Sequence, residues 1–571
     1  MRSEDLVILE IMLPLVGASF CFLAKLIHAP KVQKGLEWIG GIVGLAIPLG
    51  LLFLLYEPVK EGPLRFFVGN QHETIGIEIR FDGMSWLLGM MGFISALSAW
   101  LFSRSSGPDS PVFSALFLIQ TFAVTATAVS ADLFNLFVCF EILGIASYAL
   151  TAFSGKGRAF MAAFSYMAVS SSAMAIFLFG VFGIYRITGS LSFDAIASYI
   201  VSVNTESQIV GIGLSLVCIV VATAVRVAIL PVYGWLPEAH ASAPHAISAV
   251  LSGVLIKVPL FALGRFLFLL MATVSSVDIV FKEILEILKF TGTLTALVAV
   301  IFALSQREAK RLLAYHSISQ IGYVVSAWAM ASPVAIAAAW LHAFYHALFK
   351  GLLFLSVGSV TDAAGSKDVY AVRGAYRTGF IPTMSFFIGA LSISALPPFN
   401  GFASKAAVSS LHKGTWEYVI LSLASIGTVA SMIKLSRIFL GRPKPRNDVA
   451  AEAEWSGTPQ RIRGFWFKVS LLIFSAACVV TGLFAPKIGA LAGHLTGTDY
   501  NPVPVSLFSV PALQGALMLL VQGGLLYLFV VSKPGKTITH AIEERRPSFA
   551  GLLFAFSLAL GALGALVLFR H

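Results

Sequence analysis

Ionisable side chains occur inside long apolar runs of this sequence, where a charge is costly unless protein or water stabilises it. Seven residues share this placement: Glu141, Arg226, Lys257, His342, His346, Lys350 and Lys405. A charged side chain at mid-membrane costs roughly 2.5–3.5 kcal/mol on insertion scales, which makes each one a functional candidate. Carboxyl, ammonium and imidazole groups can exchange protons, so the set without the arginine predicts a proton relay. Taken singly, a lysine that snorkels to the interface or a histidine in a core hydrogen bond is an equal alternative.

Three of these residues follow one another at intervals of four. His342, His346 and Lys350 therefore share one face if their run is helical. A histidine pair at this spacing can also hold a metal ion, but no further cluster of ligands stands near it in the sequence. The four cysteines are isolated as well. No metal site and no cofactor is predicted.

The elements that position these residues must be membrane helices. Of 571 residues, 57% are hydrophobic and only 12% are charged, and the mean hydropathy is +0.86. This leaves too little polar surface for a soluble enzyme, a nucleic-acid-binding protein or a disordered scaffold. The predicted fold class is an all-α polytopic membrane protein, in which the net charge of +11 belongs to cytoplasmic loops.

A helix needs about 20 apolar residues to cross a bilayer. About sixteen runs of this kind are present: 5–25, 36–56, 83–103, 112–130, 132–153, 160–185, 208–230, 246–272, 285–305, 312–331, 333–358, 380–397, 414–438, 467–486, 505–531 and 549–569. The first is interpreted as a retained span, because Arg2 is outnumbered by Glu4 and Asp5 and the segment makes a poor signal peptide.

The loops carry their positive charge unevenly. One alternating set of connections holds about 22 Lys and Arg residues and the opposite set about 10. The positive-inside rule places the richer set in the cytoplasm and both termini outside a cell (inner) membrane. The connection at 57–82 then lies outside, where a short β-hairpin is expected.

Two runs are interrupted by proline. Pro231 and Pro237 follow the seventh span, and Pro397 and Pro398 end the twelfth. Irregular backbone at membrane depth requires protein or water around it, and matching breaks indicate an inverted repeat with an ion path at the breaks. The breaks are five spans apart, which makes spans 4–8 and 9–13 candidate repeat units. Ordinary proline kinks are the alternative.

These features divide the chain into four parts. Residues 1–111 form an N-terminal three-helix segment, 112–275 the first repeat (helices 4–8) and 276–440 the second (helices 9–13). Residues 441–571 contain a linker and a three-helix C-terminal extension. The hydrophilic stretch at 440–466 is interpreted as the linker, with an ordinary cytoplasmic loop as the alternative.

At these residues the sequence resembles the antiporter-like subunit family. This family comprises the proton-pumping membrane subunits of respiratory complex I, the A and D subunits of Mrp-type Na⁺/H⁺ antiporters, and relatives in membrane-bound hydrogenases. The resemblance covers roughly residues 80–440. Its matching segments are 140–141, 235–240, 243–244, 257, 310–315, 317–323, 342–350 and 397–405.

The resemblance implies two inverted five-helix repeats with helices 7 and 12 broken. It implies that Glu141 modulates the basic residue of helix 7, that Lys257 bridges the half-channels and that Lys405 ends the second. His342, His346 and Lys350 would continue the hydrated axis. The family usually has lysine where this chain has Arg226, and arginine is effectively never deprotonated. We therefore expect Arg226 to act as an electrostatic gate paired with Glu141.

The leading hypothesis is a membrane subunit that moves H⁺, either alone or in exchange for Na⁺, within a larger complex of membrane subunits. The chain has no redox, nucleotide or coupling motif of its own, which favours a subunit. Two alternatives are a structural membrane anchor for a redox or carbon-concentrating complex, and a self-contained cation/H⁺ antiporter. No nucleic-acid partner is expected.

Overall fold

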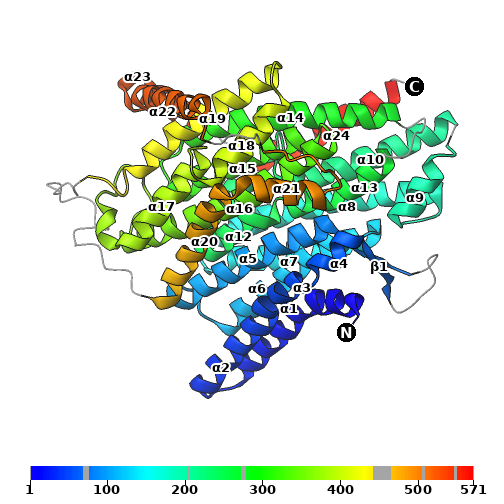
Figure 1. The fold of residues 1–571 in the computed structure, drawn as a ribbon, viewed down its shortest axis with the longest axis horizontal. Coiled ribbons are helices and arrows are strands. Elements are labelled where there is room, and N and C mark those ends of the chain that lie inside the picture. The colour runs from blue at the N-terminus through cyan, green and yellow to red at the C-terminus, as the bar shows by residue number, and fades with distance from the viewer. Residues whose placement is uncertain are drawn as a thin grey trace.

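The protein is almost entirely helical, with one short β-hairpin (Figure 1). The computed structural model describes residues 2–68, 76–203, 205–271, 278–441, 464–503, 508–545 and 549–569. The elements of its first half are α1 (Ser3–Leu26), α2 (Pro30–Gly41), η1 (Ile42–Ala46), α3 (Ile47–Leu54), α4 (Tyr56–Glu61), β1 (Leu64–Phe67), β2 (Glu78–Phe81), α5 (Gly83–Ser106), α6 (Pro111–Val129), α7 (Leu133–Ala152), α8 (Gly157–Thr188), α9 (Phe193–Ile200), α10 (Glu206–Val227), α11 (Trp235–Ser242), α12 (His245–Val250), η3 (Leu251–Leu255) and α13 (Val258–Met271).

The second half continues as helices to the end of the described chain. Its elements are α14 (Asp278–Ser305), α15 (Ala309–Trp328), α16 (Pro333–Ala363), η4 (Ala375–Thr378), α17 (Phe380–Ile393), α18 (Asn400–Leu411), α19 (Trp416–Ser436), α20 (Phe465–Leu483), α21 (Ala485–Leu495), α22 (Val510–Val531), α23 (Lys533–Glu544) and α24 (Phe549–Phe569).

Thirteen helices of the described residues are long and apolar enough to cross a membrane, which makes the chain a polytopic membrane protein. The sequence predicts about sixteen, and the other three runs form α15, α17 and α24. Helix α17 has only 14 residues because the break at Ser394 ends it, and α15 carries buried polar side chains along its length. The count of sixteen is therefore not reached.

The connection at 57–82 contains the expected hairpin strands. β1 and β2 pair antiparallel, with Leu64 opposite Phe81 and Phe67 opposite Glu78. The buried Arg80 guanidinium binds Glu78 at 2.9 Å and also pairs with Asp194 of α9. This ion-pair network fastens the hairpin to the helix that follows α8.

Helix α16 forms the centre of the molecule (Figure 1). Its best 18-residue apolar window is wholly buried, and it packs against α12, α15, α17, α18 and α20. Small residues on α16, including Ala335, Ala338 and Gly351, let neighbouring helices approach closely. The His342, His346 and Lys350 series thus lies on a helix whose apolar window is wholly buried, as is that of the span His245–Met271.

The two proline-rich segments interrupt helices in similar ways. The first separates α10 from α11 and the second separates α17 from α18. Ala228 and Ala395 have positive φ angles of 60° and 58°. Pro231, Pro397 and Pro398 lie within the interruptions, whereas Pro237 occupies the first turn of α11, where its missing N–H is tolerated.

Protein groups satisfy the freed backbone of the first interruption. The Leu230 N–H donates to the Thr295 hydroxyl at 3.0 Å, and the Trp235 indole N–H donates to the Val225 carbonyl at 2.8 Å. Irregular backbone inside a membrane requires such partners.

The C-terminal helices pack on both halves of the molecule. α20 lies against α5 and α16, α22 lies against α19, and α24 lies against α10. The predicted linker at 440–466 falls largely on 442–463, which lie outside the described residues. Figure 1 shows α22 and α24 towards opposite ends of the long axis, with α23 near α22.

Candidate functional site

Glu141 of α7 and Arg226 of α10 form an ion pair. The Arg226 Nη2 lies 3.0 Å from the Glu141 Oε1, and 4% of the arginine side chain is exposed against 29% of the glutamate. Gly144, one turn after Glu141, leaves room for the guanidinium, because a Cβ there would lie 3.1 Å from Nη2. The guanidinium also faces the Phe140 ring at 5.5 Å. Arg226 lies in the last turn of α10, just before the first interruption, so the pair connects α7 to the break.

Lys257 occupies an irregular point between the π-helical turn η3 and α13. Its ammonium donates to the Ser252 carbonyl at 2.5 Å and to the Gly253 carbonyl at 2.6 Å, and the side chain is fully buried. Carbonyls near a change in helix type have fewer intrahelical partners. Lys257 donates to two of them and so satisfies part of their hydrogen-bonding capacity.

The three residues of α16 are fully buried on one face. The His342 and His346 rings stack nearly parallel, with centroids 6.5 Å apart and planes inclined by 14°. The Lys350 ammonium donates to the Leu313 carbonyl of α15. Neither ring nitrogen of His346 has a hydrogen-bond partner among the described residues. A polar group in this state requires water.

Lys405 lies on α18, directly after the second interruption. Its ammonium is 5.0 Å from the centre of the Tyr323 ring and has no hydrogen-bond partner within the described chain. The neighbouring Ser404 hydroxyl shares a hydrogen bond of 2.9 Å with the His342 Nδ1. Lys405 is therefore joined to the α16 series through its neighbour in sequence.

Two serines connect Lys257 with Lys350. The Ser252 and Ser317 hydroxyls share a hydrogen bond at 2.7 Å, and the Ser317 hydroxyl donates to the Leu313 carbonyl at 3.2 Å. The Ser252 carbonyl also accepts from Lys257, and the Leu313 carbonyl accepts from Lys350. A polar connection thus runs from η3 through α15 to α16, in which each lysine binds a backbone carbonyl and the two hydroxyls bind each other. Because a backbone carbonyl accepts a hydrogen bond but does not pass a proton on, transfer between a lysine and a serine hydroxyl needs water.

The seven sequence candidates fall into two groups that do not touch directly. No ion pair or hydrogen bond of the described residues joins the Glu141–Arg226 pair to Lys257 or to α16. The groups approach through the packing of α10 on α13 and of α11 on α15. Any proton passing between them needs intervening water.

Several buried polar residues were not among the sequence candidates. Lys310 donates to the Ala243 carbonyl at 2.5 Å, and Lys434 donates to the Leu304 and Gln306 carbonyls at 2.7 and 2.6 Å. His240 and His316 are fully buried with both ring nitrogens unpartnered in the described structure. Lys434 lies inside the predicted run 414–438. Like Lys257, it is an ionisable residue within a long apolar run, so the same sequence criterion could have identified it.

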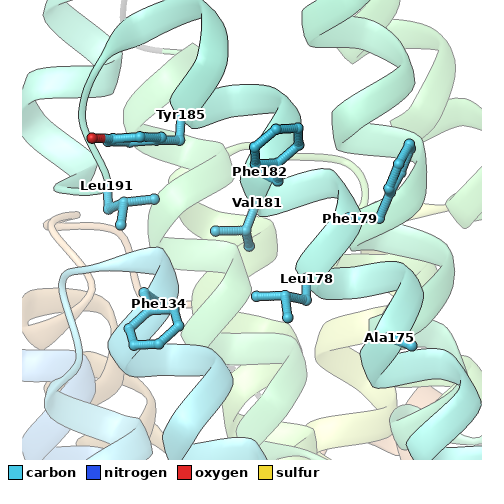
Figure 2. Close-up of a pocket in the computed structure, with 8 residues that line it drawn as sticks. All are labelled: Phe134, Ala175, Leu178, Phe179, Val181, Phe182, Tyr185 and Leu191. Atoms are coloured by element: carbon cyan, nitrogen blue, oxygen red, sulfur yellow. The ribbon is translucent and has the colours of Figure 1, made fainter.

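An apolar groove lies apart from these residues, between α7 and α8. Figure 2 shows its lining, which is hydrocarbon except for the hydroxyl of Tyr185. Its volume is about 540 Å³, and Phe179 and Phe182 are 68% and 57% exposed. A surface of this composition suits lipid tails or another apolar helix and offers no path to an ion.

Across the described residues, no group of three or more His, Cys, Asp or Glu is arranged to hold a metal ion. The His342–His346 pair instead faces Ser404 and Tyr323. The arrangement is suited to moving protons between basic and hydroxyl groups.

Comparison with known proteins adds independent information. A family described as NADH:quinone oxidoreductase/Mrp antiporter, TM, matches residues 130–433, which contain all seven candidates. The chain is 30% identical over 502 residues to the N subunit of NADH-quinone oxidoreductase from Desulforudis audaxviator, across 85% of this chain and 97% of that protein. It is 29% identical over 440 residues to the D subunit of the Na⁺/H⁺ antiporter from Alkalihalophilus pseudofirmus, across 76% and 86%.

The fold also matches a solved structure. A chain of the Mrp complex from Dietzia sp. superposes with a TM-score of 0.74 at 23% identity, covering 90% of this chain and 99% of that one. At this identity the likeness concerns the arrangement of helices.

Proposed function

Since this chain belongs to the NADH:quinone oxidoreductase/Mrp antiporter family, we propose that it moves protons through a path of buried Glu, Lys and His side chains along the middle of the membrane. Its relatives include a quinone oxidoreductase subunit and an Na⁺/H⁺ antiporter subunit. The protein is an antiporter-like membrane subunit, and we place it within a complex of further membrane subunits. H⁺ is its substrate, and Na⁺ is the cation that it exchanges when partner subunits supply the driving force.

The polar connection between Lys257 and Lys350 carries this proposal. Both ammonium groups are fully buried, and the Ser252 and Ser317 hydroxyls between them can each accept and donate a proton when water joins each hydroxyl to the nearby lysine. A purely structural core gains little from two buried lysines, because their desolvation opposes folding. Proton transfer along the plane of the membrane would explain why two lysines are buried here despite this cost.

Arg226 acts as the gate of the first half-site. Its guanidinium keeps its charge, so protonation of Glu141 decides whether the pair is neutral or positive overall. A change of charge there alters the field at Lys257 without Arg226 releasing a proton. This division of roles assigns relay steps to Lys257, His342, His346, Lys350 and Lys405.

The two interruptions support an inverted repeat. Each contains an alanine with positive φ and at least one proline, and each is followed by a helix that carries a histidine or lysine of the buried polar set. We assign 1–111 to an N-terminal segment, 112–275 and 276–440 to the repeats and 441–571 to the linker and extension. The charge of the loops places both termini outside the cell membrane.

Substitution of Lys257 by methionine tests the proposal. Methionine has a similar length and no charge, so Lys257→Met should reduce proton transport at least tenfold while the complex still assembles. Lys350→Met should have the same effect, and Ser317→Ala should slow transport less because water can replace one hydroxyl. Proton uptake by vesicles that contain the whole complex is the measurement.

Lys289→Met is the matched control. Lys289 binds Glu286 at 2.7 Å on one turn of α14 and takes no part in the connection, so its loss should leave transport unchanged. If Lys257→Met assembles normally and pumps at the original rate, the chain is a structural anchor and the path is silent.

A further inference from the structure

A cavity beside Lys405 lies between α18, α19 and the C-terminal helix α22. Its volume is about 580 Å³, far above the roughly 30 Å³ that one water molecule occupies in the liquid. Its lining carries a lysine, a tyrosine, a glutamine and several hydroxyl groups. The polar lining residues are Lys405, Ser409, Tyr418, Ser422, Ser425, Ser509 and Gln522.

Lys405 differs from the other buried lysines in what surrounds its charge. Lys257, Lys310, Lys350 and Lys434 all donate to backbone carbonyls. The Lys405 ammonium has no such partner among the described residues, although the residue is only 4% exposed and lines the cavity. A buried ammonium without a protein partner requires water, and the cavity has both the volume and the polar groups to hold it.

The cavity extends over much of the length of α22. Its lining on α22 extends from Ser509, beside the start of the helix, to Gln522. Thirteen residues of helix rise by about 20 Å, against about 30 Å for a bilayer core. On α19 the lining likewise extends from Tyr418, near the start of that helix, to Ser425, so both helices bring the cavity to the same face of the protein.

Hydroxyl groups connect the inner end of the cavity to the proposed path. The Ser425 hydroxyl shares a hydrogen bond of 2.8 Å with the Tyr323 hydroxyl, and Lys405 lies over the Tyr323 ring. On the opposite side of Lys405, Ser404 contacts His342. Lys405 therefore lies between the α16 series and the cavity.

We propose that α22 forms one wall of an aqueous half-channel through which Lys405 exchanges protons with the membrane face where α19 and α22 begin. This inference rests on the proposed function. It also assigns a role in transport to a helix that lies outside the family match at 130–433. Gln522 is a polar group at mid-helix, a position that is unfavourable against lipid and favourable beside water.

Two glycines of α22 provide a matched pair for the test. A Cβ at Gly515 or at Gly524 would meet no atom within 4 Å, so larger side chains fit at both positions. Gly515 lines the cavity and Gly524 does not. Gly515→Cys should be labelled by a charged, membrane-impermeant methanethiosulfonate in vesicles that contain the full complex, when the reagent is added to the membrane face where α19 and α22 begin. Gly524→Cys should stay unlabelled, and the unsubstituted chain with its four cysteines gives the background.

Blocking the cavity should then slow transport. Gly515→Phe should lower proton transport at least fivefold, whereas Gly524→Phe should leave it unchanged. Gln522→Leu should lower transport more than Gln514→Leu, because Gln514 lies one turn into α22 and does not line the cavity. Assembly is checked for each variant by recovery of the complex.

The outcomes separate this inference from the proposed function. If Gly515→Cys reacts only with a lipid-soluble maleimide, or Gly515→Phe transports normally, the cavity holds lipid and the inference is overturned. If the unsubstituted complex moves no protons, the proposed function fails. Labelling of Gly515→Cys from the aqueous side still decides independently whether the cavity contains water.

Discussion

Backbone carbonyls accept hydrogen bonds from most of the buried lysines of the described residues. Lys257 binds carbonyls beside a π-helical turn, and Lys434 binds two carbonyls at the end of α14. Helix ends and irregular turns leave such oxygens without an intrahelical partner. A lysine in this position satisfies carbonyl oxygens that the helix itself leaves without a donor. Lys405 differs, because no carbonyl of the described residues accepts a hydrogen bond from its ammonium group. Water must solvate this group instead.

The Glu141–Arg226 ion pair leads to a prediction about single side chains. Arg226→Lys should retain most transport because a positive charge stays beside Glu141, whereas Arg226→Ala should reduce it severely. Glu141→Gln combined with Arg226→Ala should be less harmful than the two effects multiplied, with a coupling of roughly 1–3 kcal/mol. Proton uptake by each variant in the assembled complex is the measurement. Normal transport in both Arg226→Lys and Arg226→Ala would show that the pair is not a gate.

Interrupted helices need support from neighbouring elements. The second interruption packs directly against α20, where a Cβ at Gly482 would overlap the Pro398 carbonyl oxygen and come within 2.6 Å of the Asn400 nitrogen. The Asn400 side chain also donates to the Thr481 hydroxyl at 3.2 Å. Helix α20 therefore holds the irregular backbone in place, and it does so with a residue that has no side chain.

Gly482→Ala should consequently destabilise the protein. The added methyl group must displace backbone rather than a flexible side chain, and overpacking of this kind costs about 1–3 kcal/mol. Thermal unfolding in detergent should occur at a lower temperature than for the unsubstituted protein. Gly524→Ala is the matched control, because its methyl group meets open space. Equal unfolding temperatures for the two variants would contradict the supporting role of α20.

The whole molecule is braced by its C-terminal helices. α22 packs on α19 and α24 packs on α10, while α23 contacts α14 between them. The extension therefore touches helices of both proposed repeats. None of these helices lines the apolar groove between α7 and α8 (Figure 2).

A prediction about the intact system follows from the proposal that this chain works as one subunit of a larger complex. The purified protein in liposomes should exchange neither Na⁺ nor K⁺ for H⁺ under an imposed cation gradient, whereas the complex with its partner subunits should acidify or alkalinise the vesicle interior. A fluorescent pH indicator inside the vesicles records both. Robust exchange by the chain alone would favour the self-contained antiporter instead.

The sequence alone determined the membrane class and the helical content, and it singled out some of the ionisable residues that the structure buries, among them Arg226, Lys257 and Lys350. Hydropathy and proline positions are local properties, so they located the spans, the hairpin region at 57–82 and both interruptions. They did not separate Lys405 from Lys257, nor reveal the Ser252–Ser317 bridge, because these depend on which helices pack together. Only the tertiary structure decided that Lys257 rests on its own helix's carbonyls while Lys405 faces a cavity walled by α22. The physical reason is that Lys257 binds carbonyls four and five residues before it, whereas the cavity beside Lys405 is formed by helices far away in the chain.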